Sequence, residues 1–174
     1  MNRTAFYESV PLVVFVNETA RSPEAMALAE IRAKLQKSRS GEARLSESLR
    51  RLAEAAIEAQ EPDWNGYGAQ PVDHLAVTRA RAFLGALPVD VPLPEISIDP
   101  DGEVAIEWTG GRGLRYSISI GATGRITYAG IFGGASVRGE EDANEGIAGA
   151  VLGNLRRLRM ALPSSIAGWT SSGR

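Results

Sequence analysis

The strongest constraint on the fold is a run of apolar residues at every second position between residues 96 and 128. Such alternation is typical of β-strands that bury one face and expose the other. Four stretches follow the pattern, and their apolar residues are Ile96 and Ile98; Val104, Ile106 and Trp108; Leu114, Tyr116, Ile118 and Ile120; and Ile126 and Tyr128. The sequence therefore predicts four strands in a sheet with one buried face.

Two short turns between these strands indicate how the strands pair. The segments 100–102 and 122–124 each end in glycine, which suits the left-handed residue of a three-residue hairpin loop. If Asp99 faces Glu103 across the first turn, the apolar residues of both strands fall on one face of the sheet. We therefore expect an antiparallel meander, in which each strand pairs with the next one along the chain.

Helical patterns precede the sheet. Apolar residues recur at spacings of three and four in 23–38 and again in 45–59, with Ser-Arg-Ser-Gly between them. The serines and the glycine of that link predict two helices in a hairpin, or one broken helix, over 21–62. Asp73 is then a plausible N-cap for a helix over 73–87.

A last helix is expected over 141–161. Three acidic residues at 140–142 gather where the positive end of its dipole would lie. Gly133-Gly134 is expected to end the sheet before this helix begins.

Together these elements predict an α+β fold, a four-stranded antiparallel meander packed against two helices with an N-terminal helical hairpin attached. The expected division is an extended N-terminal arm or short strand in 1–20, the hairpin in 21–62, the α+β core in 63–162 and a flexible tail in 163–174. The apolar run 10–16 is too short to span a bilayer and lacks the pattern of an export signal. We therefore expect a cytoplasmic protein that does not insert into membranes.

The composition excludes several kinds of chemistry. The chain has no cysteine and a single histidine, His74, so thiolate nucleophiles, disulfides and cysteine-ligated metal sites are impossible. His74 follows the expected N-cap and fits a surface residue better than a metal ligand. The glycine-rich stretches match neither a phosphate-binding loop nor a dinucleotide-binding fingerprint. We therefore predict no catalytic residue, no metal site and no cofactor.

The exposed face of the predicted sheet carries four carboxylates, which are our first candidates for partner binding. They are Glu95, Asp99, Glu103 and Glu107, with Glu95 opposite Glu107 and Asp99 opposite Glu103. Like charges that face each other destabilise a sheet unless something compensates, and we expect Arg115, opposite Glu107, to do so. The interpretations are a solvated sheet face with one ion pair, a surface for a basic partner, and a metal or acid–base pair.

Small side chains continue along the same face. They are Ser97, Ala105, Ser117, Ser119, Thr127 and Ala129. We expect this smooth strip to be covered, either by residues 10–16 or by another protein chain.

A basic segment is the candidate for nucleic-acid binding. Residues 32–51 contain seven basic side chains against two glutamates. The seven are Arg32, Lys34, Lys37, Arg39, Arg44, Arg50 and Arg51. The chain as a whole has a net charge of −2, which argues against a basic surface over the whole molecule. The segment indicates either solvated helix faces or a patch for nucleic acid or an acidic partner.

The segment 63–71, Asp-Trp-Asn-Gly-Tyr-Gly-Ala-Gln-Pro, interrupts the helical periodicity and must form a structured turn. Trp64 and Tyr67 either anchor this turn against the sheet or rim a pocket for a ligand or partner. The segment resembles a motif of uncharacterised bacterial proteins in which Trp-(Asp/Asn)-Gly-x-Gly-Ala-x-Pro precedes a helix, a proline-rich link and an Asp-Gly hairpin ending in Glu-Trp. The resemblance covers about residues 45–132 and implies a shared fold, but no activity is known for that family.

We therefore expect a non-enzymatic cytoplasmic protein that acts by surface binding, such as a small inhibitor, an antitoxin-like protein or a factor in conflict between a bacterial host and its phages. Its partner would be another protein, and the chain itself a monomer or a homodimer. The alternative is a nucleic-acid-associated module that uses residues 32–51. A carboxylate-dependent hydrolase is the third hypothesis.

Overall fold

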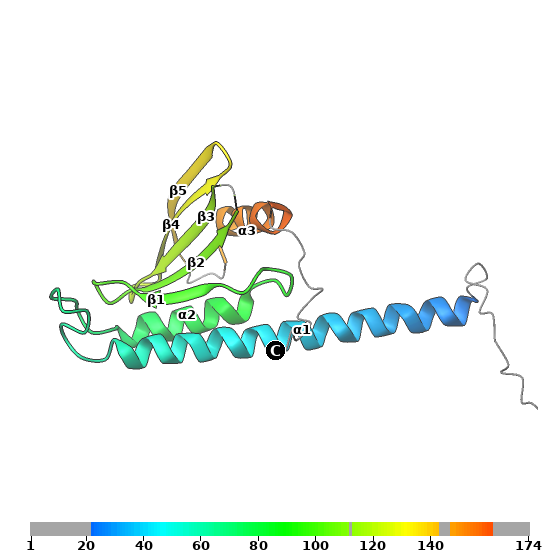
Figure 1. Cartoon of the computed structure of the whole chain (residues 1–174), viewed down its shortest axis with the longest axis horizontal. Helices are drawn as coiled ribbons and strands as arrows, with labels where there is room; N and C mark the ends of the chain where they lie inside the picture. The colour runs from blue at the N-terminus through cyan, green and yellow to red at the C-terminus, as the bar shows by residue number, and fades with distance from the viewer. Residues whose placement is uncertain (1–21, 112, 143–146, 162–174) are drawn as a thin grey trace, which may run out of the picture. The chain divides into compact units, whose positions relative to one another are not determined.

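The computed structural model describes residues 22–111, 113–142 and 147–161. The elements in chain order are α1 (Pro23–Glu58), α2 (His74–Ala86), β1 (Glu95–Ile98), β2 (Val104–Gly110), β3 (Leu114–Ile120), β4 (Arg125–Phe132), β5 (Ala135–Asp142) and α3 (Gly149–Ala161) (Figure 1). The predicted arm in 1–20 and tail in 163–174 lie outside the described residues. Within the described ranges, none of the helices is both long enough and apolar enough to cross a membrane.

The chain forms two units, Met1–Gln36 and Lys37–Arg174, and α1 runs through their boundary. In the first unit, the described part is the beginning of α1, over 23–36. Its large apolar side chains that are more than half exposed are Met26, Leu28, Ile31 and Leu35. The second unit holds the rest of α1, the sheet, α2 and α3.

The sheet contains five antiparallel strands in the order β1-β2-β3-β4-β5. The pairing expected for the first hairpin is confirmed, since Ile96 lies opposite Ile106 and Ile98 lies opposite Val104. The alternating apolar side chains point to one face, which we call the inner face. Val104, Ile106 and Ile118 have no exposed surface there. The four predicted strands and their one-sided burial are therefore present.

β5 is a fifth strand, which the sequence analysis missed because we expected Gly133-Gly134 to end the sheet. Instead these glycines form the turn between β4 and β5. Val137 is the only large apolar residue of β5, and most of the strand is exposed. An edge strand of this kind lacks apolar alternation, so the sequence pattern did not show it. The acidic residues at 140–142 were interpreted as the start of a helix instead. The expectation that the last helix begins near 141 is wrong for the same reason, because α3 begins at Gly149.

α1 is one continuous helix, so the predicted hairpin or broken helix over 21–62 is wrong. We took Gly41 as part of a break in the helix. In the structure, a Cβ at Gly41 would lie 2.9 Å from the Val89 side chain, so this glycine permits close packing of α1 against the link between α2 and β1. A glycine inside a helix costs about 1 kcal/mol relative to alanine, which does not end a helix that packs along its length.

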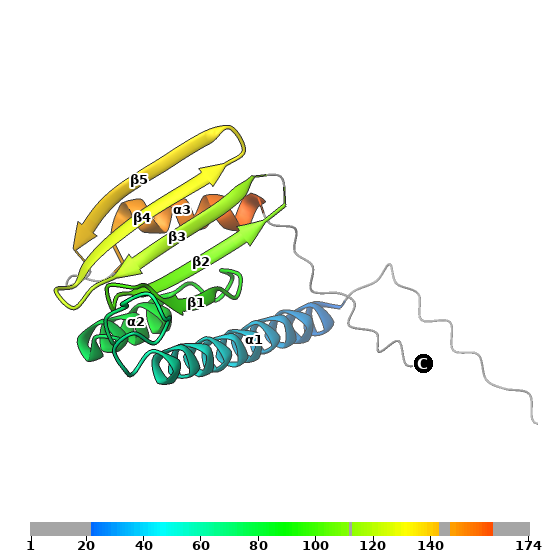
Figure 2. The same cartoon turned by 60° about the vertical axis from the view of Figure 1, so that its left-hand side comes forward.

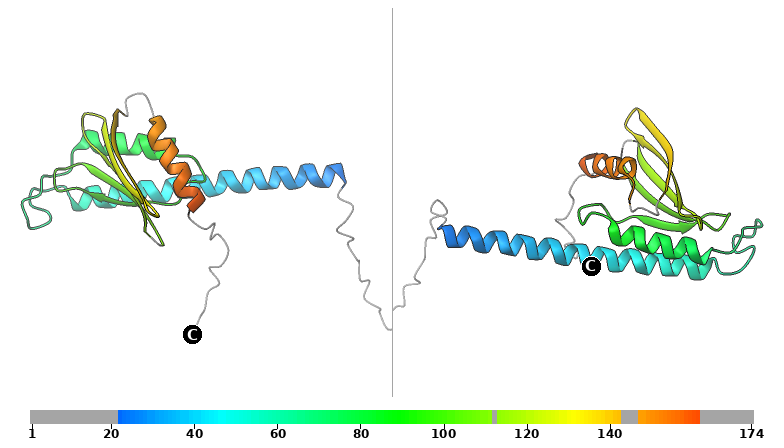
Figure 3. Two further views of the ribbon diagram at one scale, coloured as in Figure 1. Left: turned by 90° about the horizontal axis from the view of Figure 1, so that it is seen from above. Right: turned by 180° about the vertical axis from the view of Figure 1, so that it is seen from behind.

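α2 and α3 cover the inner face of the sheet. α2 contacts β2 and β3, while α3 contacts β3 and β4 and lies behind the sheet in Figure 2. Seen from above, α3 lies on one side of the sheet only (Figure 3, left). The buried residues that these helices add to the core are Ala76, Ala80, Phe83 and Leu84 from α2, and Val151, Leu155 and Leu158 from α3. The opposite face, which we call the outer face, is not covered by any helix of the described residues (Figure 2).

The start of α2 agrees with the sequence analysis. Asp73 is the N-cap, and its Oδ1 accepts a hydrogen bond from the Leu75 amide at 2.7 Å. This cap satisfies a backbone donor that the first turn of the helix leaves free.

Gly102 provides a test of how tightly the β1–β2 turn packs. Its φ is +87°, and a Cβ there would lie 2.6 Å from the Pro71 carbonyl oxygen. We expect Gly102→Ala to lower the free energy of unfolding by about 1–3 kcal/mol, because the turn must then adopt a strained backbone. Thermal denaturation measures this. In the control Gly85→Ala, within α2, the new Cβ meets nothing within 4 Å, so stability should hold or rise; equal losses in both variants would contradict the packing described.

Candidate protein-binding surface

The loop between α1 and α2 is held by hydrogen bonds that its backbone amides donate to two short polar side chains. Asp63 Oδ1 accepts from the Gly68 amide at 2.6 Å, and Asn65 Oδ1 accepts from the Tyr67 amide at 2.9 Å. The Asp63 amide also donates to the Ala69 carbonyl at 2.8 Å. Asp and Asn favour turns because their side chains reach nearby backbone amides. The predicted turn is therefore present, and its own polar groups fix its shape.

Three residues of this loop have positive φ angles. They are Asp63 at 62°, Gly66 at 74° and Gly68 at 82°. Glycine adopts this conformation freely, whereas a residue such as Asp63 is held there only by its surroundings, at a cost of about 1–3 kcal/mol. Backbone strain of this kind gathers at binding and catalytic sites.

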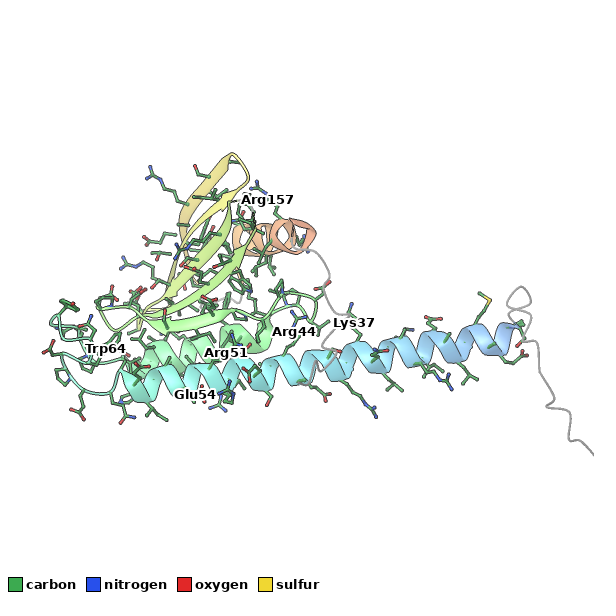
Figure 4. All side chains as sticks on the ribbon, viewed as in Figure 1. Lys37, Arg44, Arg51, Glu54, Trp64 and Arg157 are labelled. Atoms are coloured by element: carbon green, nitrogen blue, oxygen red, sulfur yellow. The ribbon has the colours of Figure 1, made fainter. Side chains whose placement is uncertain are left out.

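Trp64 anchors the loop to the rest of the second unit. It is half-buried against the core, and its Nε1 donates to the Gln70 carbonyl at 3.1 Å (Figure 4). The Gln70 amide donates in turn to the Pro100 carbonyl at 2.8 Å, and the Asp73 amide donates to the Gly102 carbonyl at 3.0 Å. These bonds fix the loop beside the turn between β1 and β2.

Tyr67 does not anchor the loop. It is 93% exposed, although its amide is bound to Asn65. Of the two interpretations of these rings, anchoring of the turn fits Trp64 but does not fit the exposed ring of Tyr67. A ring displayed on a fixed loop loses little conformational entropy when it binds, and tyrosine is enriched at the energetic centres of protein interfaces.

The four predicted carboxylates lie on the outer face of the first hairpin. Glu95 is in β1, Glu107 is in β2, Asp99 directly follows β1 and Glu103 directly precedes β2. Glu95 is opposite Glu107, and the Asp99 amide donates to the Glu103 carbonyl at 2.8 Å. Both pairings agree with the sequence analysis. Because these residues alternate with the buried ones, their side chains point away from the core.

Arg115 compensates the negative charge of Glu107, but from a different position in the sheet than we expected. It pairs with Thr109, so it lies diagonal to Glu107 and not opposite it. Its Nη2 still donates to Glu107 Oε2 at 2.7 Å, which raises the pKa of Arg115. The Thr109 hydroxyl donates to Glu107 Oε1 at 3.1 Å. Glu107 is therefore already bound within the sheet.

Ser119 joins the other pair of carboxylates, and the sequence analysis did not foresee this. Its Oγ lies 2.9 Å from Asp99 Oδ2 and 2.8 Å from Glu103 Oε2. A hydroxyl carries one hydrogen, so it donates fully to only one of the two carboxylates at a time. Burial raises the pKa of Asp99; the Ser119 hydrogen bond lowers it, and the charge of Asp101 raises it further. The net effect is that the pKa of Asp99 is raised.

The strip of small residues is continuous across the outer face. Ser97 pairs with Ala105, Ala105 with Ser119, and Ser119 with Thr127. Ser117 and Ala129 form the neighbouring pair. Residues 10–16, one of the two predicted covers, lie outside the described residues.

The basic residues of 32–51 do not form one free surface. Arg44 Nη1 donates to the Val89 carbonyl at 3.0 Å, and Arg51 Nη1 donates to the Pro94 carbonyl at 2.9 Å (Figure 4). These two arginines tie α1 to the link between α2 and β1.

Two further basic residues have acidic partners on α1 itself. Arg50 donates to Glu47 at 2.7 Å and also pairs with Glu54, and Arg50 together with Arg51 lowers the pKa of Glu47 to about 2. Lys34 pairs with Glu30 at 2.8 Å. The remaining three, Arg32, Lys37 and Arg39, are exposed.

The titratable groups offer little for metal binding. Among the described residues, no group of three or more His, Asp or Glu side chains is placed to hold a metal ion. His74 is exposed in the first turn of α2, as expected for a surface histidine.

Comparisons with models of known protein families, with curated proteins and with solved structures found no match. The resemblance of the 63–71 motif to an uncharacterised bacterial family therefore stays a prediction. What the chain does must be argued from its own residues.

The two aromatic residues of the loop should differ in their effect on stability. We expect Trp64→Ala to lower the free energy of unfolding by about 2 kcal/mol, because it removes a half-buried ring and a hydrogen bond. Tyr67→Ala should leave it within about 0.5 kcal/mol, as is usual for exposed positions. Chemical denaturation of both variants measures the difference. A comparable loss in both would mean that Tyr67 is a structural anchor after all.

Asp99→Asn should change how stability depends on pH. The pKa of Asp99 is raised in the folded chain, so folding takes up a proton there and stability falls as pH rises through the window between the unfolded and folded pKa. The variant lacks this loss. We expect its melting temperature, relative to the unaltered chain, to increase as the pH rises above the ordinary pKa of an aspartate, about 3.9. A difference that does not vary with pH would show that Asp99 ionises as easily in the folded chain as in the unfolded one.

Proposed function

We propose that this chain is a non-enzymatic cytoplasmic interaction factor that binds a basic segment of another protein. The contact surface, which we call the Tyr67 surface, consists of Tyr67, Asp99, Asp101 and Glu103. The observation that carries the proposal is the 93% exposure of Tyr67 on a loop whose conformation is fixed by its own hydrogen bonds.

The neighbouring charges favour a basic partner. The loop is joined to the β1–β2 turn through the bond between Gln70 and Pro100, so the acids of that turn lie beside it. An arginine or lysine of the partner gains from these acids and from the face of the Tyr67 ring, a contact worth about 0.5–1 kcal/mol at an exposed site. Charge complementarity of this kind also speeds association and rejects acidic partners.

This surface suits a protein that acts by covering part of its partner. Small inhibitors and antitoxin-like proteins need a rigid contact surface and no reacting groups of their own. A displayed tyrosine, together with the acids of the neighbouring β1–β2 turn, supports that role when the functional surface of the partner is basic.

Fewer observations support the nucleic-acid alternative. Phosphates would be repelled from the acids of the Tyr67 surface, so binding would have to use α1. There, Lys34, Arg44, Arg50 and Arg51 already have partners within the chain.

The test is capture of partners by the full chain from its native host, with the captured proteins quantified by mass spectrometry. We expect Tyr67→Ala to reduce specific partners by about two- to fivefold, as loss of a cation–π contact implies, and Tyr67→Phe to retain them. Added salt should weaken capture, because acids and bases form the contact.

Two results would contradict the proposal. One is a specific partner captured equally by the Tyr67→Ala variant, provided that the variant melts like the unaltered chain. The other is a partner that contacts the Tyr67 surface through an acidic segment.

A further inference from the structure

Among the described strands, β5 lies at one edge of the sheet. In the strand order of the described residues it has β4 as its only neighbour, and β4 is the only described element whose backbone lies close to it. β5 is eight residues long, whereas β1 at the opposite edge has four. A strand in this position presents a row of backbone donors and acceptors that another strand can meet.

The hydrogen bonds of the neighbouring hairpin show which residues of β5 face outward. The Gly121 amide donates to the Arg125 carbonyl at 3.1 Å, so the residues at 125, 127, 129 and 131 of β4 bond to β3. The alternate residues of β4 then bond to β5, at its positions 135, 137, 139 and 141. The backbone groups of Ser136, Arg138 and Glu140 therefore point away from the sheet.

The charges of these outward-facing residues favour pairing with an identical strand. Side chains alternate along a strand, so two antiparallel β5 strands keep their outer faces together only when even-numbered residues lie opposite even-numbered residues. Pairing centred on Gly139 places Arg138 opposite Glu140 of the second copy, and this contact occurs twice. Pairing centred on Arg138 or on Glu140 would instead set identical charges against each other.

We propose that a second copy of this chain pairs with β5 about a two-fold axis at Gly139, which joins the two five-stranded sheets into one continuous sheet. The dimer buries this edge of the sheet, and each Arg138 forms a cross-strand ion pair with Glu140 of the other copy. Because the axis is perpendicular to the sheet, both outer faces lie on the same side. The dimer then presents two Tyr67 surfaces, although the pairing itself does not depend on them.

The surroundings of β5 leave room for this pairing. Among the described elements, α3 covers β3 and β4, and its backbone does not come close to that of β5. An open groove of about 890 Å³ lies between α3 and the strands β4 and β5, and Tyr128, Val137 and Asn154 are among the residues that line it. On the inner side, therefore, no described helix blocks the approach of a second strand.

A charge swap tests the proposal on the full chain by sedimentation equilibrium. The unaltered chain should be a dimer, and Arg138→Glu or Glu140→Arg alone should weaken the dimer by about tenfold or more, because two attractive pairs become repulsive. The double variant R138E/E140R should restore it. Arg81→Glu on α2 is the matched control, since it makes the same change of charge away from β5 and should leave the dimer intact.

Other outcomes overturn the proposal. If sedimentation equilibrium shows the unaltered chain to be a monomer at about 100 micromolar, the dimer is excluded. If hydrogen exchange of that monomer still protected Ser136, Arg138 and Glu140, another segment of this chain would be the occupant. A dimer that neither single reversal weakens would use a different surface.

The variants also need a folding control, because Glu140 lies 3.9 Å from Arg125 in its own chain. Each variant is therefore checked by thermal melting. A double variant that melts normally but stays monomeric would also contradict the register.

Discussion

The burial of one face of the meander is the constraint on which the rest of the structure depends. Side chains alternate along each strand, so once Val104, Ile106 and Ile118 are buried against α2 and α3, their neighbours must lie on the outer face. Alternation with the buried residues therefore places Glu103 and Ser119 on the outer face. The core thus positions Glu103 and Ser119, and a shift of register by one residue would turn both side chains toward the inner face.

The sequence predicted the parts of the fold that bury apolar side chains in a regular pattern. Strands β1 to β4 and the register of the first hairpin follow from alternation and turn chemistry, and α2 follows from its cap at Asp73. β5 could not be found this way, because an exposed edge strand has no apolar face. Gly41 misled for another reason: the close approach of Val89 depends on tertiary packing that a local pattern does not contain.

The candidate surface was predicted in part. Alternation placed the carboxylates of the first hairpin on one face, and the glycines of the 63–71 segment indicated a structured turn. The sequence could not show that Trp64 is half-buried and Tyr67 exposed, because both residue types favour half-buried positions. Only the packing of the folded loop makes their exposure differ. The role of Ser119 depends on three strands meeting, which a single-strand pattern cannot show.

The most direct test of the account is hydrogen exchange of the full chain with and without a captured partner. The account predicts that protection on binding appears in the loop over 63–70 and in the β1–β2 turn, while the buried residues of β3 exchange as before. Protection confined to α1, with the loop and the turn unchanged, would contradict it.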